Sequence, residues 1–85
     1  MNIEQLRRAH RLVSVVEYNG DDMHPLDLDE MPKAIHAYDV ASDATYYIIE
    51  MDDGFHYAFL HPCDSVAPTL NAAEIALVDE FVQYI

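Results

Sequence analysis

The chain has 85 residues, of which sixteen are acidic and four are basic, so its formal net charge is −12 at neutral pH. A chain of this length forms one domain and buries only about 60–65% of the surface that its unfolded form exposes. The charge excludes free nucleic acid and anionic membranes as partners, because binding either requires lysines and arginines that neutralise phosphate.

The first predicted element is a helix over residues 3–18. Asn2 and Gln5 have the spacing of a capping box, and the Asn19-Gly20 pair predicts a left-handed end to the helix. A short helix followed by a strand stays open as an alternative, because the segment is rich in β-branched valine. The apolar residues that recur at helical spacing are Ile3, Leu6, Ala9, Leu12, Val13 and Val16.

Three of the four basic residues, Arg7, Arg8 and Arg11, fall on the polar face of this helix. Such a face can bind a phosphate or a carboxylate. We favour a structural interpretation, because Glu4 stands four residues before Arg8 and many other acids surround the remaining arginines.

The segment DDMHPLDLDE, residues 21–30, contains five carboxylates and no cation. Turn chemistry explains part of this, since Asp favours turns, but Asn and Ser serve turns comparably well without adding charge. In an extended backbone Asp27 and Asp29 project to the same side about 6.6 Å apart, near the spacing of phosphates along a nucleic-acid strand. The segment is therefore our candidate for contact with a basic surface.

Three strands follow: AIHAYDV (residues 34–40), TYYIIEM (45–51) and FHYAFL (55–60). A helix over residues 30–38 competes with the first of them. Asp52-Asp53-Gly54 predicts a three-residue hairpin loop between the last two. The facing pairs in that register are Met51 with Phe55, Ile49 with Tyr57 and Tyr47 with Phe59.

A second helix is predicted from Asn71, its N-cap, with Glu74 three residues on and Leu70 packing against Ile75. Its predicted apolar face consists of Ile75, Val78, Phe81, Val82 and Ile85. Surplus apolar surface at Leu77, Phe81 and Tyr84 suggests a homodimer through this helix.

Together these elements predict an α+β fold in a single domain of residues 1–85: a helix, a three-stranded antiparallel meander and a C-terminal helix, with both helices packed on one face of the sheet. No segment has the apolar run of a signal peptide or of a membrane span. Cys63 is the single cysteine, which excludes an internal disulfide. We expect a cytoplasmic protein.

The histidines and Cys63 offer the ligand types of a zinc site, but no HExxH motif or pair of CxxC motifs is present, so we expect no metal and no cofactor. Catalysis by Cys63 with His61 or His56 as base lacks any family signature around it. Asp52 and Asp53 at a hairpin tip are expected to be solvated, without the raised pKa of a general acid. We expect a protein that is not an enzyme. The metal-ligand types considered are His24, His36, His56, His61, Cys63 and Asp64.

The function expected from the charge is non-enzymatic binding to a basic, nucleic-acid-binding protein, which the chain inhibits by charge mimicry. In size and acidity the chain resembles the small acidic inhibitors of phages, such as anti-CRISPR and anti-restriction proteins. An immunity protein or antitoxin that neutralises a cationic toxin, and a salt-adapted acidic domain with no inhibitory role, are the alternatives. The expected partner-binding residues are Asp21, Asp22, Asp27, Asp29, Glu30 and Tyr38, with Tyr46 and Tyr18 as further aromatic anchors.

Overall fold

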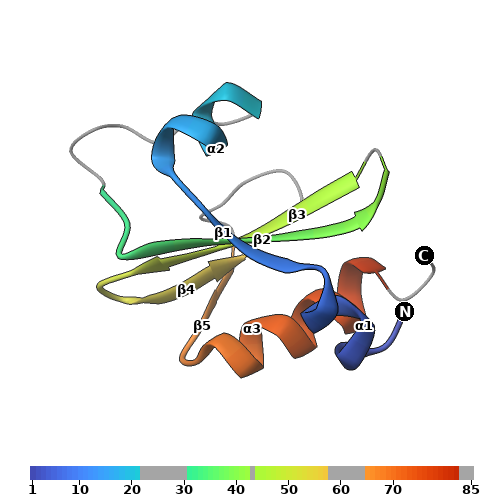
Figure 1. Cartoon of the computed structure of the whole chain (residues 1–85). Coiled ribbons are helices and arrows are strands. Elements are labelled where there is room, and N and C mark those ends of the chain that lie inside the picture. Colours follow the sequence, from blue (N-terminus) through green and yellow to red (C-terminus); the bar gives the residue numbers. More distant parts are fainter. Residues whose placement is uncertain (22–30, 43, 58–64, 83–85) are drawn as a thin grey trace.

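The structure is a computed structural model that describes residues 1–21, 31–42, 44–57 and 65–82. Helices precede and follow a central run of strands (Figure 1). In chain order the elements are α1 (Ile3–Arg8), β1 (His10–Val13), α2 (Val15–Asp21), β2 (Ala34–Ala41), β3 (Ala44–Met51), β4 (Gly54–Tyr57), β5 (Ser65–Ala67), α3 (Leu70–Leu77) and the π-helical turn η2 (Val78–Val82).

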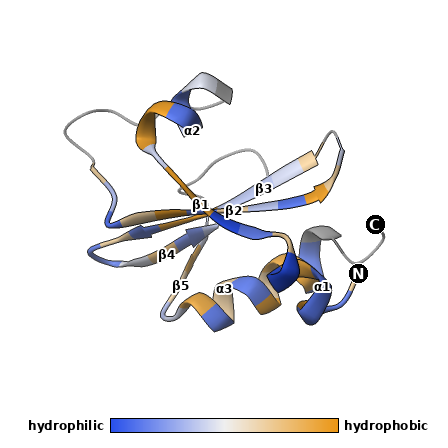
Figure 2. Ribbon diagram, viewed as in Figure 1, coloured by the Kyte–Doolittle hydropathy of each residue, from blue (hydrophilic) through white to orange (hydrophobic). Residues whose placement is uncertain are grey.

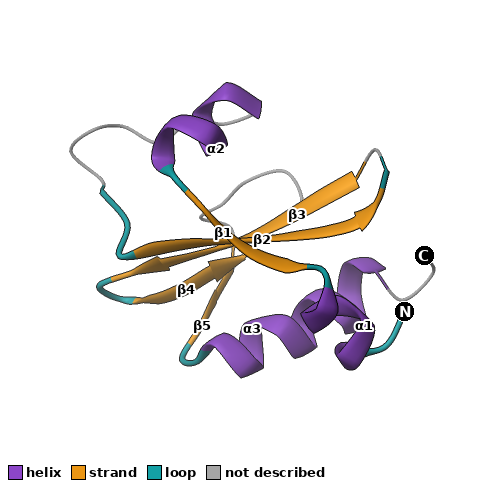
Figure 3. Ribbon diagram, viewed as in Figure 1, coloured by secondary structure: helices purple, strands orange, loops and turns teal. Residues whose placement is uncertain are grey.

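The described strands form one five-stranded antiparallel sheet in the order β1-β2-β3-β4-β5 (Figure 3). α1 and α3 lie on one face of this sheet, and α2 lies on the other (Figure 1). The α+β class is confirmed. α1 and α3 share one face, whereas α2, which contains the C-terminal part of the predicted first helix, lies on the opposite face (Figure 1). The prediction of only three strands is wrong, because β1 and β5 extend the sheet at its two edges. The helix that competed for residues 30–38 is replaced by β2.

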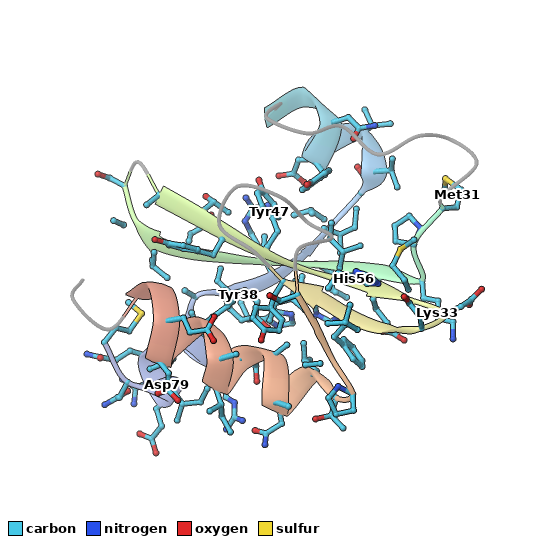
Figure 4. The ribbon with its side chains drawn as sticks, turned by 180° about the vertical axis from the view of Figure 1, so that it is seen from behind. Met31, Lys33, Tyr38, Tyr47, His56 and Asp79 are labelled. Atoms are coloured by element: carbon cyan, nitrogen blue, oxygen red, sulfur yellow. The ribbon has the colours of Figure 1, made fainter. Side chains whose placement is uncertain are left out.

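Each face of the sheet has its own cluster of buried residues. In β3, Tyr46 and Ile48 pack on the side of α1 and α3, whereas Ile49 packs on the side of α2. Figure 4 shows Tyr38 on the side of α1 and α3 and Tyr47 on the side of α2. Hydrophobic residues accordingly occur in the strands and in the helices on both sides (Figure 2). Because both faces are covered, the strands read as nearly continuous apolar runs in the sequence.

The predicted helix over residues 3–18 is wrong. The capping box of Asn2 and Gln5 is present, but α1 ends at Arg8 and β1 follows it. The alternative of a short helix followed by a strand is therefore correct. β1 forms because the backbone of residues 10–13 pairs with β2, and this ladder outweighs the helical spacing of the apolar side chains.

α2 begins after Ser14, whose hydroxyl accepts a hydrogen bond from the backbone N–H of Glu17 at 3.0 Å. This is the geometry of an N-cap, which satisfies a backbone donor that the first helical turn leaves unpaired. The helix continues through Asp21, so the predicted left-handed end at Asn19-Gly20 is also wrong.

The hairpin between β3 and β4 forms, but its ladder is shifted by one residue, and Met51 faces Gly54 instead of Phe55. Asp52-Asp53 alone make the turn. Gly54 opens β4 with φ of 139°, and a Cβ at this position would lie 2.8 Å from the carbonyl oxygen of Ala67. The absence of a side chain at Gly54 therefore allows β5 to lie close to β4. Of the other predicted pairs, Ile49 faces His56 instead of Tyr57, and the pair of Tyr47 with Phe59 includes a residue outside the described part.

The N-cap of α3 is Thr69, whose hydroxyl accepts a hydrogen bond from the backbone N–H of Ala72 at 3.1 Å. The prediction of Asn71 as N-cap is wrong; Asn71 lies in the first turn and accepts a hydrogen bond from Arg7. Thr and Asn are both favourable caps, so local sequence does not choose between them.

The buried face of α3 differs from the predicted one. Ile75, expected to face the core, is 45% exposed, whereas Ala73 and Leu77 are fully buried. Val78 packs against the core as predicted. The reason for the difference is Glu74, which is buried and bound by partners from other elements. The side chains of Phe81 and Val82, and residues 83–85, lie outside the described part.

Candidate functional site

α3 binds the side chain of Arg7. The Nε of Arg7 donates a hydrogen bond to Glu74 Oε1 at 3.0 Å, and the Nη2 of Arg7 donates one to the side chain of Asn71. Glu74 is only 5% exposed, and its other oxygen accepts the hydroxyl of Tyr38 at 2.7 Å. Burial, followed by this carboxylate, raises the pKa of Tyr38 well above its ordinary value, so the phenol stays protonated and donates. The network links α1, α3 and β2.

Arg11 makes a second set of ion pairs, on the face of the sheet that α2 covers. Its guanidinium lies 2.6 Å from Asp39 and 2.6 Å from Glu17. The hydrogen bond from Arg11, followed by one from Thr45, holds the pKa of Asp39 below its ordinary value. All three charged side chains are roughly two-fifths to one-half exposed. Because these side chains are so exposed, each pair contributes little to stability.

The side chain of Lys33, which is labelled in Figure 4, lies 3.7 Å from that of Asp52 in the β3–β4 turn, and both side chains are exposed. Three of the four basic residues are thus paired with carboxylates of the same chain. The fourth is Arg8, and within the described residues the predicted pair of Glu4 with Arg8 is not formed. The predicted face of three arginines is also divided, because Arg11 lies on β1. This pairing agrees with a structural role for Arg7 and Arg11.

Carboxylates remain exposed at separate places on the described surface. Asp52 occupies the β3–β4 turn, with its side chain 98% exposed. Asp79 lies on the side of the sheet that α1 and α3 cover (Figure 4). Glu4 on α1 and Glu80 on η2 are exposed as well. Negative charge is therefore present at both ends of the described fold, and not in one patch alone.

The predicted partner-binding residues are not brought together in the described part of the chain. Asp21 is the last residue of α2, and Tyr38 is fully buried, with its hydroxyl bound to Glu74. Tyr18 and Tyr46 are also buried. The three tyrosines form core contacts, and the expectation of an aromatic surface anchor among them is not supported. The other predicted residues, Asp22, Asp27, Asp29 and Glu30, lie outside the described residues.

A histidine pair joins the two strands at one edge of the sheet. His10 Nε2 lies 2.8 Å from His36 Nδ1, and the rings stack with their centroids 5.0 Å apart. His36 is 8% exposed, and its Nε2 has no hydrogen-bond partner among the described residues. Burial, followed by the proximity of His10, lowers the pKa of His36. His10 was not a candidate from the sequence, because residues 3–18 were predicted to form one helix. The alternative of a short helix followed by a strand would have pointed to it, since His10 begins β1.

His56 has a different environment on the other face of the sheet. Its Nε2 lies 2.6 Å from Asp53 Oδ1, and this contact lowers the pKa of Asp53. A general acid at neutral pH needs a raised pKa, so Asp53 does not have the property that such a role requires. His61 and Cys63, the other members of the catalytic arrangement considered above, lie outside the described residues.

Within the described ranges, no group of three or more His, Cys, Asp or Glu side chains is arranged to hold a metal ion. Two of the candidate ligands, His36 and His56, are described but lie on opposite faces of the sheet. The remaining candidates, His24, His61, Cys63 and Asp64, lie outside the described part. The helices of the described part are too short or too polar to cross a membrane.

Comparison of the chain with models of protein families, with curated protein sequences and with solved structures finds no match.

Proposed function

We propose that this protein is a non-enzymatic acidic inhibitor that binds a basic, nucleic-acid-binding protein by charge mimicry, in the manner of phage anti-CRISPR or anti-restriction proteins. The observation that carries the proposal is the excess of acids combined with the pairing of the cations. The chain has sixteen acidic residues and four basic ones. Three of the basic residues form ion pairs with carboxylates of the same chain. Within the described residues, the carboxylates of Glu4, Asp79 and Glu80 are exposed and available to a partner.

The mechanism follows from the range of electrostatic forces. A charge of −12 attracts a positive surface over distances longer than a contact and accelerates the encounter. Once bound, the protein occupies the surface on which the partner would bind phosphate, so the partner cannot bind nucleic acid. The attraction weakens as salt screens it. Acids of residues 21–30 remain the proposed contact, with the exposed acids of the described fold adding to the field.

The test uses purified basic effectors, namely a guide-loaded CRISPR nuclease and a restriction endonuclease, with DNA cleavage as the readout. The wild type is compared with a variant in which Asp22, Asp27, Asp29 and Glu30 are changed to the corresponding amides. The matched control changes Glu4, Asp52, Asp79 and Glu80 in the same way, so that each variant removes four of the negative charges.

We expect the wild type to inhibit cleavage by one of the two effectors, the first variant to lose at least about tenfold in affinity, and the control to lose less. Affinity of the wild type should also fall between about 0.05 M and about 0.5 M NaCl. Inhibition that is insensitive to salt, or equal loss in both variants, would contradict a contact through residues 21–30. No binding to either effector would contradict the proposed partner class.

A further inference from the structure

The His10–His36 pair has a protonation requirement that follows from its geometry. At 2.8 Å the two facing nitrogens share one proton, so one ring donates and the other accepts. The second nitrogen of His36 is buried and has no partner among the described residues. An unpaired buried N–H costs more than an unpaired acceptor. The favoured arrangement is therefore His36 Nδ1–H donating to His10 Nε2, with the exposed side of the His10 ring facing solvent.

A further proton disturbs this arrangement wherever it binds. A proton on His10 Nε2 would point at the N–H of His36 and break the contact, unless the proton of His36 moved to its buried Nε2. A proton bound directly by His36 would place both a charge and an unpaired N–H in the interior. The neutral pair is thus the one protonation state that satisfies the hydrogen bond without a buried unpaired donor.

We propose that the His10–His36 pair is a pH-sensitive latch, which holds β1 against β2 while both imidazoles are neutral and releases β1 when the pair is protonated. This inference does not depend on the proposed inhibitory function. β1 is suited to such release, because it is an edge strand of four residues with no described strand on its other side. It also connects α1 to α2, so its release would loosen residues 3–21.

The charged groups that face the pair do not remove this sensitivity. Glu50 on β3 and Glu74 on α3 favour protonated His36, but burial and His10 have larger effects and lower its pKa from 6.5. Glu74 also accepts hydrogen bonds from Arg7 of α1 and from Tyr38 of β2. The ring of Tyr38, whose hydroxyl is protonated, contacts the ring of His10. On the same face β4 contributes Phe55, which is apolar, and Tyr57.

The direction of the pH effect follows from linkage. Because the pKa of His36 is lowered by folding, the unfolded chain binds this proton more readily than the folded chain. The stabilisation by the neutral pair is fully present above pH 6.5 and is lost as the pH falls through that value toward the lower pKa of the folded state. Asp39 and Asp53, whose pKa values are lowered from 3.8, lose their contributions only in a more acidic range.

The test is hydrogen exchange of the β1 amides at about pH 7.5 and about pH 5.5, on either side of the ordinary histidine pKa, corrected for the intrinsic exchange rate. We expect the protection of β1 to fall by at least about tenfold, the factor that corresponds to one pKa unit, while the β3 amides stay protected. Equal protection of β1 at both pH values would overturn the proposal.

Two variants remove titration but keep a polar atom in position: His10→Gln, which replaces Nε2, and His36→Asn, which replaces Nδ1. His36→Asn should abolish the pH dependence of β1, whereas His10→Gln should only reduce it, because His36 stays buried and can still be protonated. His56→Gln, on the opposite face of the sheet, is the matched control and should retain it. If a variant does not fold, ¹⁵N shifts of the wild-type imidazoles decide the question: His36 should carry its proton on Nδ1 and titrate below 6.5. Titration of His36 at its ordinary value would refute the latch.

Discussion

At the scale of single residues, two of the part-buried polar contacts join positions that are far apart in the chain. Arg7 and Glu74 are separated by 67 residues, and His10 and His36 by 26. No spacing rule connects such positions, because helical and strand periodicity relate only near neighbours. From the sequence we expected acids near the arginines, but we assigned Glu74 to a helix cap and not to a buried ion pair.

Tyr38→Phe should destabilise the protein by about 1–3 kcal/mol, because it removes a donor from the buried carboxylate of Glu74. Tyr57→Phe is the control, since this half-buried hydroxyl makes no hydrogen bond to another described residue. Urea unfolding of the two variants measures the difference. A loss in the control as large as that in Tyr38→Phe would mean that the contact with Glu74 has no special importance.

At the scale of helices and strands, local patterns identified the central strands but not the edge of the sheet. β2 and β3 are covered on both faces, so their apolar runs are long and unambiguous in the sequence. β1 is short and exposed, and its residues also suit a helix. Its conformation depends on pairing with β2, which is a tertiary contact.

Gly54→Ala should cost about 1–3 kcal/mol, because the residue has a positive φ and a Cβ would meet Ala67 and Val66 at 2.8 Å. Gly20→Ala is the matched control. Gly20 lies within α2 with nothing near its missing Cβ, so alanine there should stabilise the protein by about 0.5–1 kcal/mol. Thermal unfolding of both variants tests the pair; a neutral Gly54→Ala would contradict the observed approach of β5 to β4.

At the scale of the whole molecule, net charge is the dominant property. The fold measures 34 × 27 × 19 Å. The Debye length is about 30 Å at 0.01 M salt and about 8 Å at 0.15 M, so in dilute buffer each carboxylate interacts with charges across most of the molecule. The ion pairs of Arg11 and Lys33 are exposed and offset little of this repulsion.

Stability should therefore rise with salt between about 0.01 M and about 0.5 M NaCl, because screening of the net repulsion exceeds the weakening of the few surface ion pairs. The urea midpoint at each salt concentration measures this, and we expect the protein to be folded throughout. A chain that is largely unfolded in dilute buffer would favour the salt-adapted alternative. A midpoint that falls with salt would show that the ion pairs dominate.

The sequence alone determined the net charge, the α+β class, the capping box at Asn2 and the central strands, because composition, local hydrogen bonding and apolar runs are properties of neighbouring residues. Only the tertiary structure decided that residues 3–18 divide at β1, that Gly54 belongs to a ladder, that Glu74 is buried and that His10 meets His36. Each of these features depends on contacts between backbone or side-chain groups of distant segments. The energy of such contacts outweighs local preference, and the residues that make them have no periodic spacing in the sequence.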